Sequence, residues 1–386
     1  MRSEFLGYIR PGRRAGVRNH VLIIPTVACA VGVARMVANA VPGTIALEHG
    51  HGCGRVPEVP MHERVLVNIG RNPNTFAAVY IGLGCESLDA RKIAAEAGKD
   101  NPNVCAFVIQ EDGGSMETAR KAAEFAREMV ACASALRREP VPVSELTVGL
   151  ECGGSDALSG ITANPSIGRM SDWLVSEGGS SILTETTEFL GTQDSLGKQG
   201  ADEQLCREIR GLIAQGEKYA VEIAGPKASR VISPGNMEGG MSTIQEKSLG
   251  CIRKAGYSPV RQVLEYGEIP CVRGLCIMDG PGYDVESMTG LVAGGAQICV
   301  FSTGRGNPIG HPCCPVIKVA SNSRIFHAMP GDMDINAGTI LEGGSLEQTG
   351  REIIEFLVSV ASGELTAAER NRQGGILGIY TFSRAF

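Results

Sequence analysis

Aromatic residues and long apolar runs are scarce in this sequence. Phe, Tyr and Trp together make up 5% of the 386 residues, and Trp173 is the single tryptophan. The longest apolar stretch, residues 21–34, contains Pro25 and is shorter than the roughly 20 apolar residues that a membrane-spanning helix needs. We therefore expect a protein without a membrane segment.

The sequence also lacks the patterns that indicate nucleic-acid or nucleotide binding. Its formal net charge is −6 and it contains no strongly basic block, which argues against contact with a phosphate backbone. No GxxxxGK(S/T) motif is present, and Gly82 and Gly84 lack the third glycine of GxGxxG. We therefore expect no nucleic-acid partner, and a nicotinamide-dependent redox enzyme is the weakest enzyme hypothesis.

Cysteine and glycine, by contrast, are abundant. The 13 cysteines are an odd number spread over the whole chain, which favours reduced thiols and a cytoplasmic location over a disulfide framework. Many of the 51 glycines cluster in short runs that also contain Cys, His, Asp, Glu or Asn. Such runs are typical of loops whose backbone approaches a ligand closely.

Strand and helix patterns alternate along the chain. In the first part, the strands are predicted at 21–25, 44–47, 76–83 and 104–109. Continuous apolar strands separated by amphipathic helices indicate parallel sheets covered on both faces. We expect an α/β fold with two Rossmann-like parallel-sheet regions, and a proline-containing linker at 137–145. The predicted domains are an N-terminal α/β domain, 1–140, and a C-terminal α/β catalytic domain, 141–386.

Reactive side chains follow the predicted strands, and the carboxyl ends of parallel strands meet at one edge of a sheet. These residues are Cys29, the run from His49 to Cys53, Cys85 with Glu86, and Glu151 with Cys152. The spacing His-x-His-x-Cys places three possible metal donors within a glycine-rich loop, because imidazole and thiolate bind iron and zinc. A glycine-rich turn with unrelated histidines and an inert cysteine is the alternative.

Several longer motifs together resemble the altronate/galactarate dehydratase family over nearly the whole chain. They include Gly16-Val17-Arg18-Asn19, Gly82-Leu83-Gly84-Cys85-Glu86, the run from Gly149 to Pro165, Ser233-Pro234-Gly235-Asn236, the run from Glu246 to Cys251, and Phe301-Ser302-Thr303-Gly304-Arg305-Gly306. The resemblance implies a lyase that removes water from a sugar acid or a related small hydroxy acid. It also implies Fe²⁺, replaceable by Mn²⁺, as cofactor.

Two departures from the family pattern bear on the substrate and the partners. The small N-terminal domain of the antifreeze-like (SAF) type is missing, so we expect a separate small SAF-domain subunit, as in sulfolactate sulfo-lyase of the same family. His51 replaces a tyrosine of the altronate enzymes, and Gly54-Arg55 replaces a Ser-Gln pair. Arg55 has the fork geometry that binds a carboxylate or sulfonate. We also expect a homo-oligomer.

Metal polarisation of the substrate and acid–base catalysis are the two requirements of such an elimination. We expect the metal ligands to be His49 and Cys53, with Cys85, Glu86 or Cys152 completing the set. The acid–base candidates are Lys247, His51 and Glu151. The substrate-binding candidates are Arg55, Asn164, Asn236, Ser302, Thr303 and Arg305. An iron–sulfur cluster held by Cys29, Cys53 and Cys85 is the alternative to a single metal ion.

Three functions remain open from the sequence. The first is a hydro-lyase of the altronate/galactarate type that takes a proton from the carbon next to the carboxylate. The second is the large subunit of a (2R)-sulfolactate sulfo-lyase, which releases sulfite. The third is a non-catalytic metal-binding or sugar-acid-binding protein, against which the density of reactive residues in the loops argues.

Overall fold

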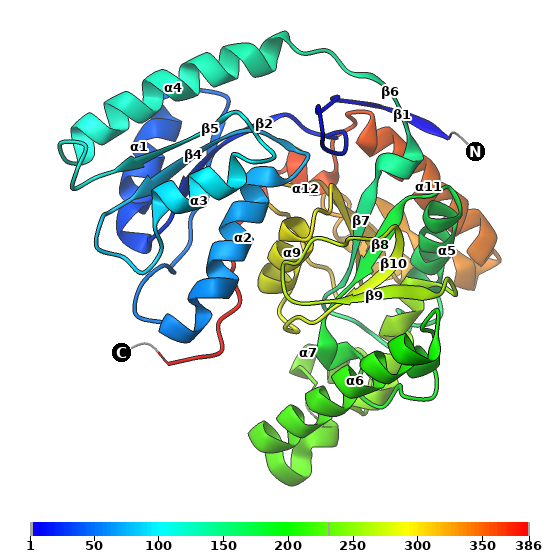
Figure 1. The fold of residues 1–386 in the computed structure, drawn as a ribbon. Coiled ribbons are helices and arrows are strands. Elements are labelled where there is room, and N and C mark those ends of the chain that lie inside the picture. The colour runs from blue at the N-terminus through cyan, green and yellow to red at the C-terminus, as the bar shows by residue number, and fades with distance from the viewer. Residues whose placement is uncertain (1–2, 231, 385–386) are drawn as a thin grey trace.

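The computed structural model describes residues 3–230 and 232–384, and it contains two parallel sheets that lie beside each other (Figure 1). The first sheet has the order β3-β2-β4-β5, and every neighbouring pair is parallel. Its strands are β2 (His20–Pro25), β3 (Thr44–Ala46), β4 (Thr75–Gly82) and β5 (Val104–Val108). Helices α1 (Val31–Ala40) and α4 (Ser115–Ala135) cover one face, and α2 (Val59–Arg71) and α3 (Ala90–Ala97) cover the other.

The second sheet has seven strands in the order β13-β12-β11-β7-β8-β10-β9, again with every neighbouring pair parallel. The strands are β7 (Thr147–Cys152), β8 (Ser180–Leu183), β9 (Val260–Leu264), β10 (Gly274–Met278), β11 (Ile298–Thr303), β12 (Val316–Ala320) and β13 (Ile335–Asn336). Helices α5 (Ala163–Ser176) and α11 (Leu346–Ala361) pack on one face, and α9 (Asp284–Ala293) packs on the other. Two parallel sheets with helices on both faces confirm the predicted fold class.

The predicted linker at 137–145 is the first difference between expectation and structure. Within it, β6 (Glu139–Pro142) pairs antiparallel with β1 (Glu4–Gly7), and a 3-10 helix, η3 (Val143–Glu145), follows. Pro140 and Pro142 suggested a loop, but proline is tolerated in a strand that has only one partner. The segment is therefore an ordered ribbon at the base of the second sheet.

Three further elements of the structure were not clear from the sequence pattern. Helix α5 begins at Ala163 and contains Pro165 in its first turn, where proline removes no hydrogen bond from a helix. Strand β9 was missed because it is an edge strand that carries Arg261 and Gln262. Helix α9 was missed because a glycine-rich segment precedes it.

The two sheets share one hydrophobic core. Buried residues of α2, α3 and α9 form a single cluster that also contains side chains of β2, β4 and β11. Buried Asn72 donates to the carbonyls of Val292 and Ala296, so the ends of α2 and α9 are joined. Helices α2 and α9 consequently lie side by side between the sheets (Figure 1).

The last residues of the chain return from the second sheet to the first. Leu377 donates its backbone N–H to Glu48, and the N–H groups of Phe382 and Ser383 both donate to the buried carboxylate of Glu58, at 2.7 and 2.5 Å. This segment, residues 377–384, is called the C-terminal strap below.

The remaining helices lie toward one end of the second sheet or connect its strands. Helices α6 (Glu203–Ala224), α7 (Pro234–Glu238) and α8 (Ile244–Cys251) extend at the lower end of the molecule in Figure 1. Short helices α10 (Ser323–Ala328) and α12 (Ala367–Arg370) follow β12 and α11. Among the residues that the structure describes, no helix combines the length and the apolar character that crossing a membrane requires.

Candidate active site

The candidate site lies at the carboxyl edge of the seven-stranded sheet, where the strand order reverses. From β7 the chain continues to β8 on one side, whereas β11 and β12 lie on the other side. Ligands of open parallel sheets bind in the crevice at such a reversal. The end of β7 carries Glu151 and Cys152, and the end of β11 carries Ser302 and Thr303.

Three carboxylates gather at this edge, and they are here called the carboxylate cluster: Glu151, Glu185 and Asp284. One oxygen of each lies within 4.8 Å of the others. Glu151 is fully buried and neither of its oxygens accepts a hydrogen bond, whereas the Oε2 of Glu185 accepts none but lies 3.7 Å from the Lys254 Nζ. Burial, and next the negative charge of Asp284, raise the pKa of Glu151 to about 8. Buried carboxylates without partners are costly, so a positive species is expected among them.

The backbone of Glu185 is also unusual. Its φ of 72° lies in the left-handed region, which non-glycine residues rarely adopt. Strained residues of this kind concentrate at functional sites because the surrounding structure holds them there. Here the strain turns Glu185, which follows β8, toward Glu151.

A buried lysine faces the same region from β12. Strand register aligns Glu151, Phe301 and Lys318 across three adjacent strands, so their side chains emerge on one face. The Lys318 Nζ lies 3.4 Å from the centroid of the Phe301 ring and has no hydrogen-bond partner. Burial lowers the pKa of Lys318 to about 7, although Asp284 and Glu151 act in the opposite direction.

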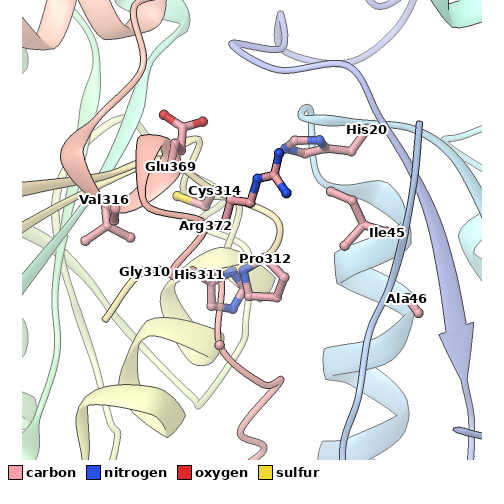
Figure 2. Close-up of a pocket in the computed structure, with 13 residues that line it drawn as sticks. His20, Ile45, Ala46, Gly310, His311, Pro312, Cys314, Val316, Glu369 and Arg372 are labelled. Carbon is pink, nitrogen blue, oxygen red and sulfur yellow. The ribbon is translucent and has the colours of Figure 1, made fainter. Parts of the chain in front are cut away.

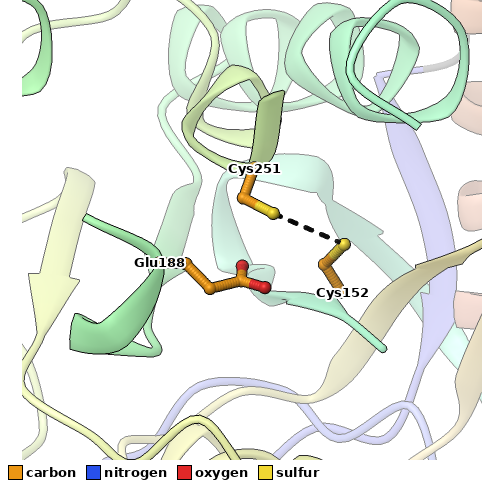
Figure 3. A group of neighbouring side chains, drawn as sticks. All are labelled: Cys152, Glu188 and Cys251. Carbon is orange, nitrogen blue, oxygen red and sulfur yellow. Dashed lines mark hydrogen bonds between the residues drawn. The ribbon is translucent and has the colours of Figure 1, made fainter. Parts of the chain in front are cut away.

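A second group, here called the thiol group, consists of Cys152, Glu188 and Cys251 (Figure 3). The two sulfurs lie 3.9 Å apart, and Cys152 is 2.6 Å from the Ser155 hydroxyl. The hydrogen bond from Cys251 lowers the pKa of Cys152 to about 6; burial opposes this shift and the charge of Lys254 supports it.

Two lysines neutralise the thiol group. The Lys254 Nζ lies 2.8 Å from one oxygen of Glu188, and the Lys247 Nζ lies 3.1 Å from the other. Burial by itself would raise the pKa of Glu188, but the two positive charges lower it to about 2. Lys254 is fully buried, whereas 18% of the Lys247 side chain is exposed, so Lys247 is the amine of this pair that reaches solvent.

The metal ligands expected from the sequence are not assembled in one place. Within residues 3–230 and 232–384, the groups of three metal donors are the carboxylate cluster and the thiol group, and only Cys152 of the expected set belongs to either. His49 Nε2 lies 2.7 Å from the Pro25 carbonyl, and its Nδ1 accepts the His51 N–H. The Glu86 carboxylate accepts N–H groups from its own loop, those of Leu83 and Gly84.

The loops that carry the remaining expected residues lie together at the edge of the four-stranded sheet. Ser87 donates to the Gly52 carbonyl, and Ala28 donates to the His51 carbonyl. Cys29, Cys53 and Cys85, the expected ligands of the alternative iron–sulfur cluster, are exposed there and do not form a group of close donors in the described residues. The His51 ring lies edge-on to His62, 5.2 Å between centroids.

The expected substrate-binding residues divide into two sets. Asn164 and Ser302 are joined by a 2.6 Å hydrogen bond at the site, and Asn236 donates to the Ser155 carbonyl. Thr303 accepts the Gly306 N–H, and Arg305 pairs with Glu238 at 2.6 Å. Arg55 lies instead beside the four-stranded sheet and donates to the Ser383 carbonyl of the C-terminal strap.

The site contains charged residues that were not identified from the sequence: Glu185, Glu188, Lys254, Asp284 and Lys318. One signal was available for Lys318, since a lysine in the middle of the apolar strand Val316–Ala320 has to be buried. A buried charge without a function is rare because its burial is costly. Glu185, Glu188 and Lys254 lie at or in short 3-10 turns without a recognisable pattern, and Asp284 is the first residue of α9.

Cavities occur at both ends of the seven-stranded sheet. A cavity of about 420 Å³ lies where β2 and β12 begin, with His20, His311 and Arg372 in its wall (Figure 2). Another, of about 280 Å³, lies at the carboxyl edge beside Arg305. The first is at the amino ends of the strands, away from the candidate site, whereas the second adjoins it.

Replacement of Lys318 by methionine should stabilise the metal-free protein by about 1 kcal/mol or more at pH 6. The ordinary pKa of 10.5 falls to about 7 on folding, so between these values the unfolded chain binds more protons and stability rises with pH. The cost of burying the charge is therefore complete below pH 7 and disappears above pH 10.5. Urea unfolding at pH 6 and pH 10, with a chelator present, measures both effects; an equal gain at the two pH values would contradict this assignment.

The fold and the site together define an α/β protein with a buried cluster of carboxylates and amines at the carboxyl edge of a parallel sheet, where ligands of such sheets bind. Residues 7–134 match the family described as "D-galactarate dehydratase/Altronate hydrolase, second domain", and residues 143–381 match "D-galactarate/Altronate dehydratase, C-terminal". The chain belongs to the galactarate/altronate dehydratase family. It is therefore an enzyme of the lyase class, and the resemblance seen in the sequence motifs is confirmed.

Characterised relatives cover most of the chain. Altronate dehydratase of Bacillus subtilis is 38% identical over 381 residues, which are 95% of this chain and 76% of that protein. The (2R)-sulfolactate sulfo-lyase subunit beta of Chromohalobacter salexigens is 35% identical over 372 residues, 95% of this chain and 94% of that subunit. Galactarate dehydratase (L-threo-forming) of Escherichia coli is 33% identical over 384 residues, 93% of this chain and 73% of that protein.

Proposed function

We propose that this enzyme dehydrates a sugar acid, or a related small hydroxy acid, by removing the proton next to the carboxylate and expelling the neighbouring hydroxyl. The observation that carries the proposal is the carboxylate cluster at the strand reversal, with Lys247 and Lys318 beside it. The altronate and galactarate dehydratases among the relatives support this type of reaction.

The carboxylate cluster fits a divalent metal ion better than the thiol group does. Both buried oxygens of Glu151 lack a hydrogen-bond partner and, among the described residues, no lysine or arginine pairs with them, so a cation would satisfy them. Both oxygens of Glu188 are already paired with lysines. Oxygen donors suit Fe²⁺ or Mn²⁺, and we propose Glu151, Glu185 and Asp284 as the ligands. When bound, the metal supplies polarisation of the substrate carboxylate and of the departing oxygen.

Two lysines have the electrostatic surroundings that acid and base roles require. Despite burial, the charge of Glu188 raises the pKa of Lys247, so its ammonium group keeps a proton for the departing hydroxyl. Lys318, with a pKa of about 7, has a neutral amine available to accept the proton next to the carboxylate. In this proposal Glu151 binds the metal and does not act as the base. An acid–base role for His51 stays a prediction from the sequence.

Anaerobic assays with Fe²⁺ across aldonic, aldaric and sulfonated hydroxy acids test the reaction. We expect a 2-keto-3-deoxy acid to form from at least one sugar acid, and loss of that activity after chelation with recovery on adding Fe²⁺ or Mn²⁺. Lys247→Gln should lower kcat by about 10²-fold or more, the usual contribution of a general acid. Unchanged turnover after complete chelation would contradict the metal requirement.

Release of sulfite from sulfolactate is the second candidate function. The similarity to the sulfo-lyase subunit covers 95% of this chain, a share equal to that shared with altronate dehydratase. The same assays therefore include sulfolactate, with sulfite measured directly. They are run with and without a small subunit of the SAF type, which we propose as a separate partner.

A further inference from the structure

A pocket beside the candidate site has not been given a role. It has a volume of about 280 Å³, and its wall includes Asp156, Glu238, Gly304, Arg305, Asn322 and Arg324. These residues follow β7, β11 and β12 or belong to α7, so the pocket opens at the same carboxyl edge as the carboxylate cluster. A ligand at the cluster therefore has this pocket as its neighbour.

Two arginines, Arg305 and Arg324, line the pocket. In the described part of the chain, no carboxylate lies within 4 Å of the Arg324 guanidinium, and Arg324 is exposed. Arg305 pairs with Glu238, whose side chain is 65% exposed. Exposed ion pairs of this kind contribute about 0–1 kcal/mol, so an incoming anion can replace Glu238 at little cost.

The fourth charged residue of the wall, Asp156, forms no ion pair with either arginine in the described part of the chain. One of its oxygens accepts hydrogen bonds from Ser159 and Ser321, and the other accepts one from Asn322. Asp156 is buried and thus fixes the loops that form the wall. A Cβ at Gly304 would lie 2.2 Å from the Asp156 carboxyl carbon, so the wall is tightly packed at this point.

One short loop connects the pocket to the carboxylate cluster. The Asp284 carboxylate lies 2.3 Å from the Cβ position of Gly153, and Arg305 Cβ lies 3.4 Å from that of Gly154. Because these glycines are adjacent, the Asp284 carboxylate and Arg305 Cβ are at most about 13 Å apart. The long arginine side chain shortens the remaining gap, so one small molecule can contact both regions.

We propose that this pocket binds a second anionic group of the substrate, a carboxylate at the end remote from the reacting carbon. The inference rests on the proposed function and narrows it to acids with two carboxylate ends. Arg324 and Arg305 are the recognising residues, because a guanidinium group binds a carboxylate through two parallel N–H bonds. Glu238 competes with the substrate for Arg305.

The test compares galactarate, altronate and sulfolactate as substrates of the wild-type enzyme and of Arg324→Gln, each with Fe²⁺. We expect Arg324→Gln to lower kcat/KM for the preferred two-anion substrate at least tenfold more than for altronate, mainly through KM. Loss of a hydrogen bond to a charged group commonly has an effect of this size. Glu238→Gln should lower KM for the same substrate. Arg351→Gln, an exposed arginine on the remote helix α11, is the matched control.

The outcomes separate this inference from the proposed function. Keto-acid formation from galactarate without sulfite identifies a remote carboxylate as the second anion, whereas sulfite release from sulfolactate identifies the sulfonate as the leaving group. The pocket assignment is overturned if the wild-type enzyme dehydrates altronate but no two-anion acid, or if Arg324→Gln affects every substrate equally. In either case the proposed hydro-lyase function is retained. If no acid is turned over, the proposed function fails. Calorimetric binding of galactarate and sulfolactate then decides the pocket: weaker binding to Arg324→Gln supports it, and unchanged binding overturns it.

Discussion

Glu151→Gln is expected to remove most of the bound iron and to lower kcat by about 10²–10³-fold, since a catalytic metal ion contributes several kcal/mol. Glutamine keeps the size of the side chain but removes one negative charge from the carboxylate cluster. A neutral amide is a weaker ligand, and the lower total negative charge of the cluster attracts a cation less strongly. Metal analysis of the purified variant and steady-state kinetics measure the two effects separately.

Glu58→Gln is the matched control for this substitution. Glu58 is a fully buried glutamate in the other half of the molecule, and its carboxylate accepts hydrogen bonds from the C-terminal strap. Glutamine retains an acceptor oxygen for those N–H groups. We expect normal iron content in Glu58→Gln; normal iron content in Glu151→Gln would instead remove Glu151 from the proposed ligands.

Lys254→Met is expected to destabilise the protein by about 3–5 kcal/mol, the usual cost of breaking a buried ion pair from one side. The Lys254 Nζ lies 2.8 Å from Glu188 and both side chains are almost completely buried. Removing the lysine leaves the Glu188 charge with Lys247 as its nearest counter-charge. Urea unfolding at neutral pH measures the loss.

The double variant Lys254→Met/Glu188→Gln distinguishes the stability lost with the ion pair from the stability lost with the packing of the lysine side chain. Because the second substitution removes the unpaired charge, the double variant should recover more than half of the stability that Lys254→Met loses. A double variant as unstable as the sum of the two single variants would show that the lysine stabilises the protein by packing alone.

The fold was predictable because its strands are continuous apolar segments, and buried parallel strands require that composition. The same reasoning placed Glu151 and Cys152 correctly at the end of a strand. It also placed the loops around His49 and Cys85 at the edge of the other sheet. The order of strands along the chain does not show which loops come together in one site, or from which of the two sheets they come.

The grouping of charges at the site was not predictable from spacing. Glu185 and Glu188 share one turn but lie far in the sequence from both Glu151 and Asp284, and these residues converge through the order of β7, β8, β10 and their neighbours. Conversely, the spacing His-x-His-x-Cys looks like a set of ligands. It gave no sign that both ring nitrogens of His49 already bond to the backbone of Pro25 and His51.

The C-terminal strap has a consequence for how the molecule is made. Every strand and helix of the four-stranded sheet is encoded before residue 136, so this half can begin to fold early during synthesis. Yet the hydrogen bonds to buried Glu58 come from Phe382 and Ser383, which are translated only after the whole second sheet. The four-stranded half is therefore completed only once the C-terminal strap has been synthesised, and until then Glu58 depends on water.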